Sequence, residues 1–262
     1  MRRLVEISVV LMVLAACLLS AAAEAAPPKE ELEIGVSTSE IAVRSNFSGA
    51  DITVFGVIKH ADPFTLALNQ YDLIVTLEGP KLETTVRKKQ RVFGIWMNRH
   101  SVEFLPIPTS YSQSSTRPID LISTQPVLDR LAVGIKHLRL PTASVSGSAA
   151  DTGEFREALL RLKEQDGLYR SDSGGVQFVG STLFKASIRL PANIPVGTHI
   201  VHGYLFKNGR FVADEELPLH VVKTGVEQYI YAMAHQYGFL YGLFAVLLAG
   251  LAGWLGSLIF RD

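Results

Sequence analysis

The sequence predicts a mainly β protein: an antiparallel, immunoglobulin-like β-sandwich with two helical insertions, followed by one C-terminal transmembrane helix. Short alternating or wholly apolar runs, bounded by turn residues, recur through residues 32–222, which is typical of a sandwich. Two stretches, residues 126–138 and 152–165, instead repeat their apolar residues at helical spacing. Residues 237–260 carry no charged side chain, and a helix of that length crosses the roughly 30 Å hydrocarbon core of a bilayer.

Residues 1–25 have the pattern of a secretory signal peptide. Arg2 and Arg3 form a basic start, residues 4–19 are mostly apolar, and an A-x-A cleavage signal ends at Ala25. We therefore expect cleavage after Ala25 and export of the chain that follows.

Two alternatives to this cleavage stay open. The apolar segment could remain as an uncleaved N-terminal anchor. Residues 14–17 also fit the cleavage box of a bacterial lipoprotein, which would leave Cys17 as a lipidated N-terminus. In each case a short polar linker, residues 26–31, leads into the folded domain.

The strands are recognised by alternation, or by apolar runs between turn signals. The segment 183–190 alternates apolar and polar residues along its whole length. Asn208 and Gly209 form the preferred dipeptide of a type I′ hairpin turn. We expect strands at residues 32–37, 40–44, 52–59, 71–78, 86–97 and 102–105, and then at 183–190, 197–206 and 211–222.

The two helices interrupt this strand pattern. Pro126 suits the first turn of the helix 126–138. In the helix 152–165, Glu157 faces Arg161 one turn later. The small, polar segment 142–148 between the helices is expected to be a loop. If the domain divides into two subdomains, the boundary falls near residues 110–125.

The C-terminal part of the chain is expected to reach and cross the inner membrane. Residues 223–236 read as a juxtamembrane helix, residues 237–260 as the transmembrane helix, and residues 261–262 as a cytoplasmic tail. A cleaved signal followed by a stop-transfer helix places residues 32–222 in the periplasm. One charge-free helix neither encloses a pore nor relays an ion, so the chain is not expected to transport a solute alone.

Small residues recur along the transmembrane helix, where helices in lipid pack closely against one another. Besides inner-membrane lipid, they predict a helix partner, either a second copy of the chain or another membrane protein. The positions expected to pack are Gly238 and Gly242, followed on a neighbouring face by Ala245, Ala249, Gly253 and Ser257.

Composition excludes several classes of function. The formal net charge is zero, and it stays balanced when residues 1–25 are removed, so there is no electrostatic case for binding nucleic acid. The only cysteine, Cys17, lies in the signal segment. We therefore expect no disulfide, thiolate metal site or cysteine nucleophile in the mature domain, and no cofactor.

One candidate ligand site follows from the hydroxyl-rich segment 109–116, which runs directly into Arg117. Ser115, Thr116 and Arg117 could together bind a small oxyanion such as sulfite or sulfate. The simpler interpretation is a loop whose hydroxyls satisfy turns and whose Arg117 pairs with a nearby carboxylate.

The densest basic cluster comprises Arg87, Lys88, Lys89 and Arg91. On a strand, Arg87, Lys89 and Arg91 share a face. That face could meet anionic lipid or an acidic partner, although a solvated strand face is the simpler explanation.

The sequence assigns neither metal ligands nor catalytic residues. Met97 and His100 lie three residues apart, as do His199 and His202, but residues at that spacing point to opposite faces of a strand. No G-x-S-x-G motif surrounds any serine.

Four strings resemble a family of alphaproteobacterial transmembrane proteins of unknown function, and the likeness covers about residues 30–262. The strings are Gly94-Ile95-Trp96, STRP at 115–118, LPANIPVG at 190–197 and the K-x-G-x-E pattern that begins at Lys223. The resemblance implies a single-pass protein with an exported domain, and a permease of the sulfite-exporter type as its partner. It supplies no catalytic residues.

These observations predict a non-enzymatic, membrane-anchored periplasmic accessory protein that interacts with a membrane protein, such as that permease. The alternative is a periplasmic module, tethered to the inner membrane, that binds a small oxyanion.

Overall fold

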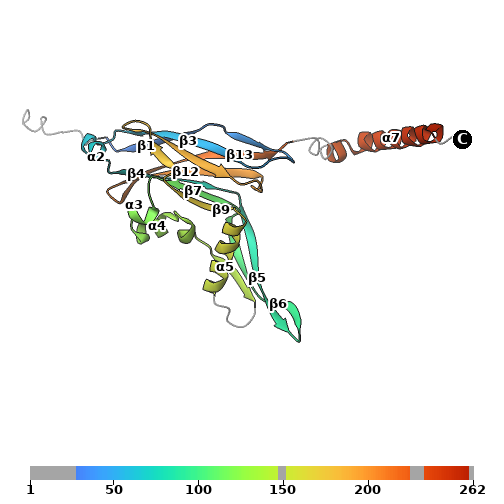
Figure 1. Cartoon of the computed structure of the whole chain (residues 1–262), viewed down its shortest axis with the longest axis horizontal. Helices are drawn as coiled ribbons and strands as arrows, with labels where there is room; N and C mark the ends of the chain where they lie inside the picture. Colours follow the sequence, from blue (N-terminus) through green and yellow to red (C-terminus); the bar gives the residue numbers. More distant parts are fainter. Residues whose placement is uncertain (1–27, 147–151, 225–232, 260–262) are drawn as a thin grey trace, which may run out of the picture.

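The structure is a computed structural model that describes residues 28–146, 152–224 and 233–259, with side chains as far as residue 256. It consists of a β-sandwich, a long hairpin that projects from it, and a C-terminal helix (Figure 1). The predicted signal peptide, the two alternatives to its cleavage and the predicted tail at residues 261–262 lie outside the described residues.

Two sheets pack face to face to form the sandwich. The four-stranded sheet is antiparallel throughout and has the strand order β1-β3-β11-β10. Its strands are β1 (Glu31–Val36), β3 (Ala50–Lys59), β11 (Leu183–Leu190) and β10 (Val176–Phe178).

The six-stranded sheet has the order β2-β13-β12-β4-β7-β9. Its inner pairs are antiparallel, whereas the edge pairs β2–β13 and β7–β9 are parallel. The prediction of a mainly β, antiparallel sandwich is therefore confirmed, with parallel pairing at these two edges. The strands are β2 (Glu40–Val43), β13 (Arg210–Lys223), β12 (Gly197–Lys207), β4 (Tyr71–Glu78), β7 (Tyr111–Ser115) and β9 (Tyr169–Ser173).

The main hydrophobic core lies between the two sheets, because alternate residues of each strand point inward. In β11, Phe184 and Ile188 are buried at the positions that the alternation predicts. Gly56 of β3 makes room for this packing. A Cβ at this position would lie 2.7 Å from the Phe184 ring and 2.4 Å from the Glu33 carbonyl oxygen.

Two short helices cover the outer face of the six-stranded sheet. They are α3 (Ile119–Ile122) and α4 (Gln125–Leu131), and they pack on Ile74 of β4 to form a second core. The predicted helix 126–138 is therefore too long. It ends because Ala132 adopts a left-handed conformation (φ 56°) and Gly134 has a φ of 107°, after which a single 3₁₀ turn follows at Ile135–His137.

A three-stranded sheet, separate from the sandwich, forms a projecting arm. We call its strands the arm: β5 (Lys81–Val92), β6 (Ile95–Pro108) and β8 (Thr142–Ser146). The predicted continuous strand 86–97 is wrong, because the chain reverses at Phe93 and Gly94, whose φ values of 48° and 87° suit a type I′ turn.

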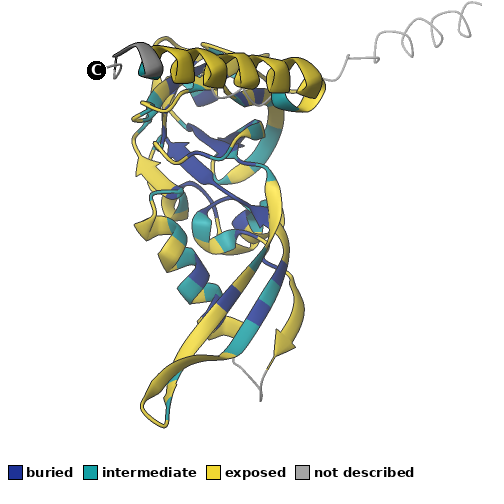
Figure 2. Cartoon of the chain, turned by 90° about the vertical axis from the view of Figure 1, so that its right-hand side faces the viewer, coloured by how far each residue is buried: buried dark blue, intermediate teal, exposed yellow. Residues whose placement is uncertain are grey.

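The arm also corrects two smaller predictions. Residues 142–146 are not a loop but a strand paired with β6, and the strand expected at 102–105 is part of the much longer β6. The helix α5 (Thr152–Gln165), which has the predicted bounds, packs on the base of the arm and forms a third core with Val102 and Phe104. Figure 2 shows buried residues near the base and exposed residues at the far end.

The chain leaves the sandwich at Lys223, the last residue of β13. This residue was expected in a juxtamembrane helix, and most of that helix, residues 225–232, lies outside the described residues. Helical structure is present at residues 233–236. It is followed by α7 (Gly238–Ile259), which agrees with the transmembrane helix predicted at 237–260.

The predicted subdomain boundary near 110–125 falls on β7 and α3. Strand β7 pairs with both β4 and β9 in the six-stranded sheet, so chain segments from both sides of this position form one sheet. The hairpin turn between β12 and β13 is at Asn208 and Gly209, with φ values of 50° and 79°, as the sequence predicts.

Candidate functional site

The three residues proposed as anion ligands do not form one site. Arg117 donates hydrogen bonds to Asp72 from Nε (2.9 Å) and Nη2 (2.6 Å), and Thr116 Oγ1 donates to the same carboxylate at 2.9 Å. Ser115 is fully buried in β7. The hydrogen bond with Asp72 raises the pKa of Arg117, so the guanidinium is a structural partner of this carboxylate.

A cavity of about 640 Å³ borders this ion pair, between α2 (Pro63–Ala67) and β10. Its wall includes both Thr116 and Asp72. A bound oxyanion would therefore lie beside a carboxylate, and this geometry disfavours anion binding at Arg117.

The hydroxyl-rich segment is a strand, not the loop that the sequence suggested. The hydroxyls of Ser112 and Ser114 in β7 donate to the backbone carbonyls of Arg189 (3.4 Å) and Ser187 (2.6 Å) in β11. These bonds satisfy backbone carbonyls of β11 and join the two sheets, so the serines have a structural role.

A buried serine–histidine pair was missed by sequence reasoning. Ser110 Oγ lies 3.3 Å from His199 Nε2, and His199 Nδ1 lies 3.3 Å from the Gly197 carbonyl oxygen. Both side chains are buried, and burial lowers the pKa of His199. The third group is a backbone carbonyl rather than a carboxylate, so the pair lacks both the access and the orienting acid of a hydrolase.

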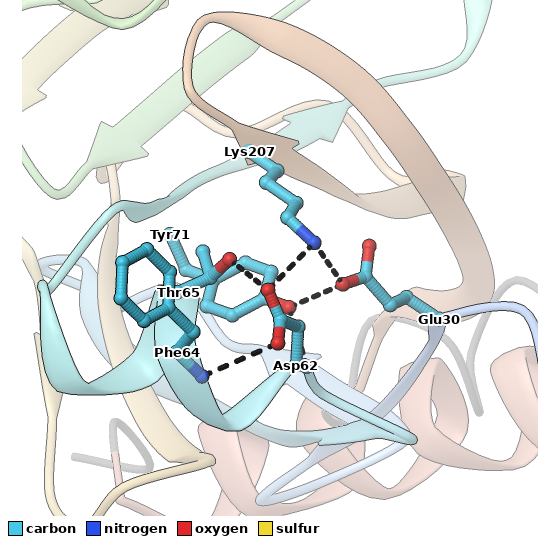
Figure 3. Close-up of polar contacts among 6 residues, drawn as sticks. All are labelled: Glu30, Asp62, Phe64, Thr65, Tyr71 and Lys207. Carbon is cyan, nitrogen blue, oxygen red and sulfur yellow. Dashed lines mark hydrogen bonds and ion pairs between the residues drawn. The ribbon is translucent and has the colours of Figure 1, made fainter. Parts of the chain in front are cut away.

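A polar cluster ties the start of the domain to the β12–β13 hairpin (Figure 3). Lys207 Nζ lies 2.8 Å from Glu30 Oε1 and 3.2 Å from Asp62 Oδ2. The Tyr71 hydroxyl donates to Glu30 and accepts from the backbone N–H of Asp62 at 2.9 Å. The cluster therefore joins the chain before β1, the loop before α2 and the end of β12.

The two carboxylates of this cluster are held in their ionised form. A hydrogen bond from the Thr65 hydroxyl, and then one from Lys207, lower the pKa of Asp62 to about 2. Burial opposes the same change at Glu30, but hydrogen bonds from Lys207 and Tyr71 still lower its pKa. Both carboxylates share the single ammonium group of Lys207, so the cluster links three segments of the chain to one another.

Within residues 28–146, 152–224 and 233–259, no group of three or more His, Cys, Asp or Glu residues could hold a metal ion. His199 is engaged in the core, and His202 lies 3.5 Å from Glu216 at the surface.

The C-terminal helix α7 exposes the small residues that the sequence singled out. Among the described residues it is the one helix long and apolar enough to cross a membrane, and no residue of its apolar window is buried. A Cβ built on Gly238, Gly242 or Gly253 would meet no atom within 4 Å. Ala245 and Ala249 are exposed on the same helix, and Ser257 lies in it with its side chain outside the described part.

The tip of the arm, residues 92–97, is a second exposed apolar surface, and the sequence did not reveal it. Phe93 is fully exposed, and Ile95, Trp96 and Met97 are 68%, 67% and 52% exposed. The basic cluster that the sequence did reveal lies just behind this tip on β5. The tip is exposed because α5 covers only the base of the arm, and local sequence patterns do not show which parts of the chain α5 covers.

The β-rich domain and the apolar C-terminal helix define the class: a transmembrane protein with one candidate span. The chain belongs to the family described as "Putative transmembrane protein (Alph_Pro_TM)", whose model matches residues 31–262. The resemblance inferred from the sequence is thereby confirmed.

None of the curated proteins compared matches the chain. Among solved structures, AggA, the major subunit of aggregative adherence fimbriae type I from Escherichia coli, is similar at 10% identity with a TM-score of 0.24. The match covers 75% of this chain and 98% of AggA, and at this TM-score it carries no argument.

Proposed function

We propose that this protein is a non-enzymatic accessory protein, anchored in the inner membrane by α7 and carrying its sandwich on the periplasmic side. The observation that carries the proposal is the face of small residues on α7, which contacts nothing else among the described residues. Helices in lipid associate through such faces, because small side chains let two backbones approach closely.

The small residues of α7 gather on one side. At 3.6 residues per turn, Gly238, Gly242, Ala245, Ala249 and Gly253 fall within a sector of about 80°. They thus share a face more fully than the sequence analysis supposed. Bulky residues such as Leu247 and Trp254 lie on the opposite side, so one face suits a helix and the other suits lipid.

The described residues also favour interaction over catalysis. The serine–histidine pair of Ser110 and His199 is closed inside the core, and both carboxylates of the polar cluster are engaged by Lys207. A permease of the sulfite-exporter type is proposed as the partner on the strength of the family resemblance. The alternative, oxyanion binding through Arg117, gains no support from a guanidinium committed to Asp72.

Site-specific crosslinking in native membranes tests the proposal. A photoreactive amino acid is placed at Ala249, on the small face, and at Leu247, on the opposite face, in the full-length chain. We expect Ala249 to crosslink to the permease and Leu247 to crosslink to no protein. A product of the mass of a homodimer alone would reject the permease, and the absence of any protein crosslink at Ala249 would reject the proposed packing face.

A matched pair of substitutions gives a second readout. Ala249→Leu adds bulk to the small face and should abolish co-purification of the permease in mild detergent. Leu247→Ala changes the opposite face and should leave co-purification unchanged.

A further inference from the structure

The arm leaves the sandwich at the end from which the chain continues to α7. In the six-stranded sheet, Val221, close to the end of β13, pairs with Gly197, and Glu78, at the end of β4, pairs with Ile200. The arm begins just after Glu78, and a Cβ at Gly197 would lie 3.2 Å from the Pro80 side chain. The base of the arm and the exit of β13 are therefore neighbours, and we call this end of the sandwich the exit end.

The lengths of the arm and of the linker before α7 allow the tip of the arm and the transmembrane helix to reach the same membrane surface. Strand β5 has 12 residues, which extends about 40 Å at 3.3 Å per residue. From Thr224 to Met233 the chain spans at most about 32 Å if extended, and the largely helical residues from there to Gly238 add about 8 Å at 1.5 Å per residue. The sandwich cannot move far from the bilayer, and the arm is long enough to bridge the remaining gap.

The tip presents apolar side chains on both faces of the hairpin. Trp96 pairs with Arg91 on one face, whereas Ile95 pairs with Val92 and Met97 with Gln90 on the other. The exposed Phe93 is held at positive φ, which is unfavourable for an aromatic residue, so this side chain does not serve the stability of the turn. These side chains form a small, narrow apolar tip. Such a tip suits insertion into a fluid membrane interface better than contact with a flat protein surface. Tryptophan in particular favours the headgroup region.

The charge around the tip is of one sign, although the whole chain is neutral. Between residues 84 and 102 there is no acidic residue. Lys88 is bound to Glu154 of α5 at 2.6 Å, while the other basic side chains are exposed. The five basic residues of this segment are Arg87, Lys88, Lys89, Arg91 and Arg99.

We propose that the tip of the arm docks on the anionic phospholipid surface of the membrane that α7 enters. Phe93, Ile95 and Trp96 enter the headgroup region, and the basic residues behind them bind lipid phosphates. The sandwich is then attached to the membrane at two points, the span and the arm. This contact needs no partner protein and goes beyond the proposed function.

The fluorescence of Trp96 in the full-length protein tests this directly. The chain has two tryptophans, so Trp254→Phe leaves Trp96 as the single reporter. The protein is reconstituted in nanodiscs of phosphatidylcholine alone, or of phosphatidylcholine with phosphatidylglycerol. We expect the anionic discs to shift Trp96 emission to the blue, to protect it from acrylamide, and to allow quenching by lipids brominated near the headgroup.

Charge variants separate lipid docking from other causes. Removing Arg87, Lys89 and Arg91 together as serines should weaken docking by about fivefold per charge, and high salt should act in the same direction. As a matched control, Lys185, Arg189 and Arg210, which are exposed elsewhere on the sandwich, are changed to serine. This control should leave the Trp96 signal unchanged.

Three results would overturn the inference. The first is Trp96 emission that stays fully exposed in both kinds of disc. The second is lipid quenching of equal strength with and without anionic lipid. The third is a blue-shifted signal that brominated lipids do not quench, which would assign the tip to a contact with protein, such as a second copy of the chain.

Discussion

Arg117 donates two hydrogen bonds to Asp72, at 2.9 and 2.6 Å, although the two residues lie 45 positions apart in the sequence. The Asp72 side chain is only 9% exposed, while that of Arg117 is 48% exposed. The pair thus secures a nearly buried carboxylate of β4 from the segment that follows β7. It also occupies the one arginine that the sequence offered as an anion ligand.

Replacing Arg117 should therefore affect stability rather than ligand binding. Arg117→Ala leaves the Asp72 carboxylate without its main donor, and we expect the free energy of unfolding to fall by about 1–3 kcal/mol. Chemical denaturation of the full-length protein in detergent measures this, with the exposed Arg210→Ala as the control. Sulfite or sulfate should not raise the melting temperature of the wild type. A rise that Arg117→Ala abolishes would restore the oxyanion hypothesis.

The turn at the arm tip should be more stable with asparagine in place of Phe93. Phe93 has a φ of 48°, and asparagine tolerates this conformation better than phenylalanine. We expect Phe93→Asn to raise the free energy of unfolding by up to about 1 kcal/mol, the order of the penalty for the left-handed conformation, and to weaken lipid docking at the same time. The opposite change at the equivalent turn position, Asn208→Phe, should destabilise the protein. If Phe93→Asn is destabilising, the side chain has a packing role that the exposed tip does not show.

Burial of His199 makes stability depend on pH. The pKa of His199 in the folded protein lies below its ordinary 6.5, so the unfolded chain binds the proton more tightly. The free energy of unfolding should fall as the pH drops from 6.5 through the folded pKa, by at most about 1.4 kcal/mol per pH unit. His199→Gln should remove this slope, whereas His202→Gln on the same strand should keep it. A slope that survives in His199→Gln would assign it to another group.

The polar cluster in Figure 3 predicts that Thr65 and Lys207 both influence the pKa of Asp62. The pKa of this carboxyl is lowered to about 2, first by the Thr65 hydroxyl and then by Lys207. Thr65→Val and Lys207→Met should therefore each raise this pKa toward its ordinary 3.8, because each removes a group that favours the ionised carboxylate. A titration of the carboxyl carbon by NMR measures this, and an unchanged pKa in both variants would contradict the described contacts.

Local patterns predicted those elements whose signals are local. The alternation of β11, the bounds of α5 and the Asn208–Gly209 turn agree with the structure, because each depends on residues close in sequence. The turn at Phe93 was missed because a phenylalanine in its first central position hides the turn signal of the following glycine. Strand β7 was taken for a loop because its serines bond to β11, which lies far away in the sequence.

The candidate sites, too, could be predicted from the sequence only where their signals are local. The small face of α7 and the basic residues of β5 are visible in sequence, since both follow from regular spacing. The partners of Arg117 and Ser110 are not, because Asp72 and His199 lie 45 and 89 residues away. The exposed arm tip was not predicted either, because the exposure of a segment depends on which distant parts of the chain cover it.

Reporter fusions after Asp262 test directly whether α7 crosses the membrane with the sandwich outside the cytoplasm, on which the proposed function depends most. A green fluorescent protein fused there should fluoresce and alkaline phosphatase should be inactive, because both would lie in the cytoplasm, and the fusions should stay in the membrane after a carbonate wash. An active phosphatase at this position, or release of the chain into the soluble fraction, would contradict this topology.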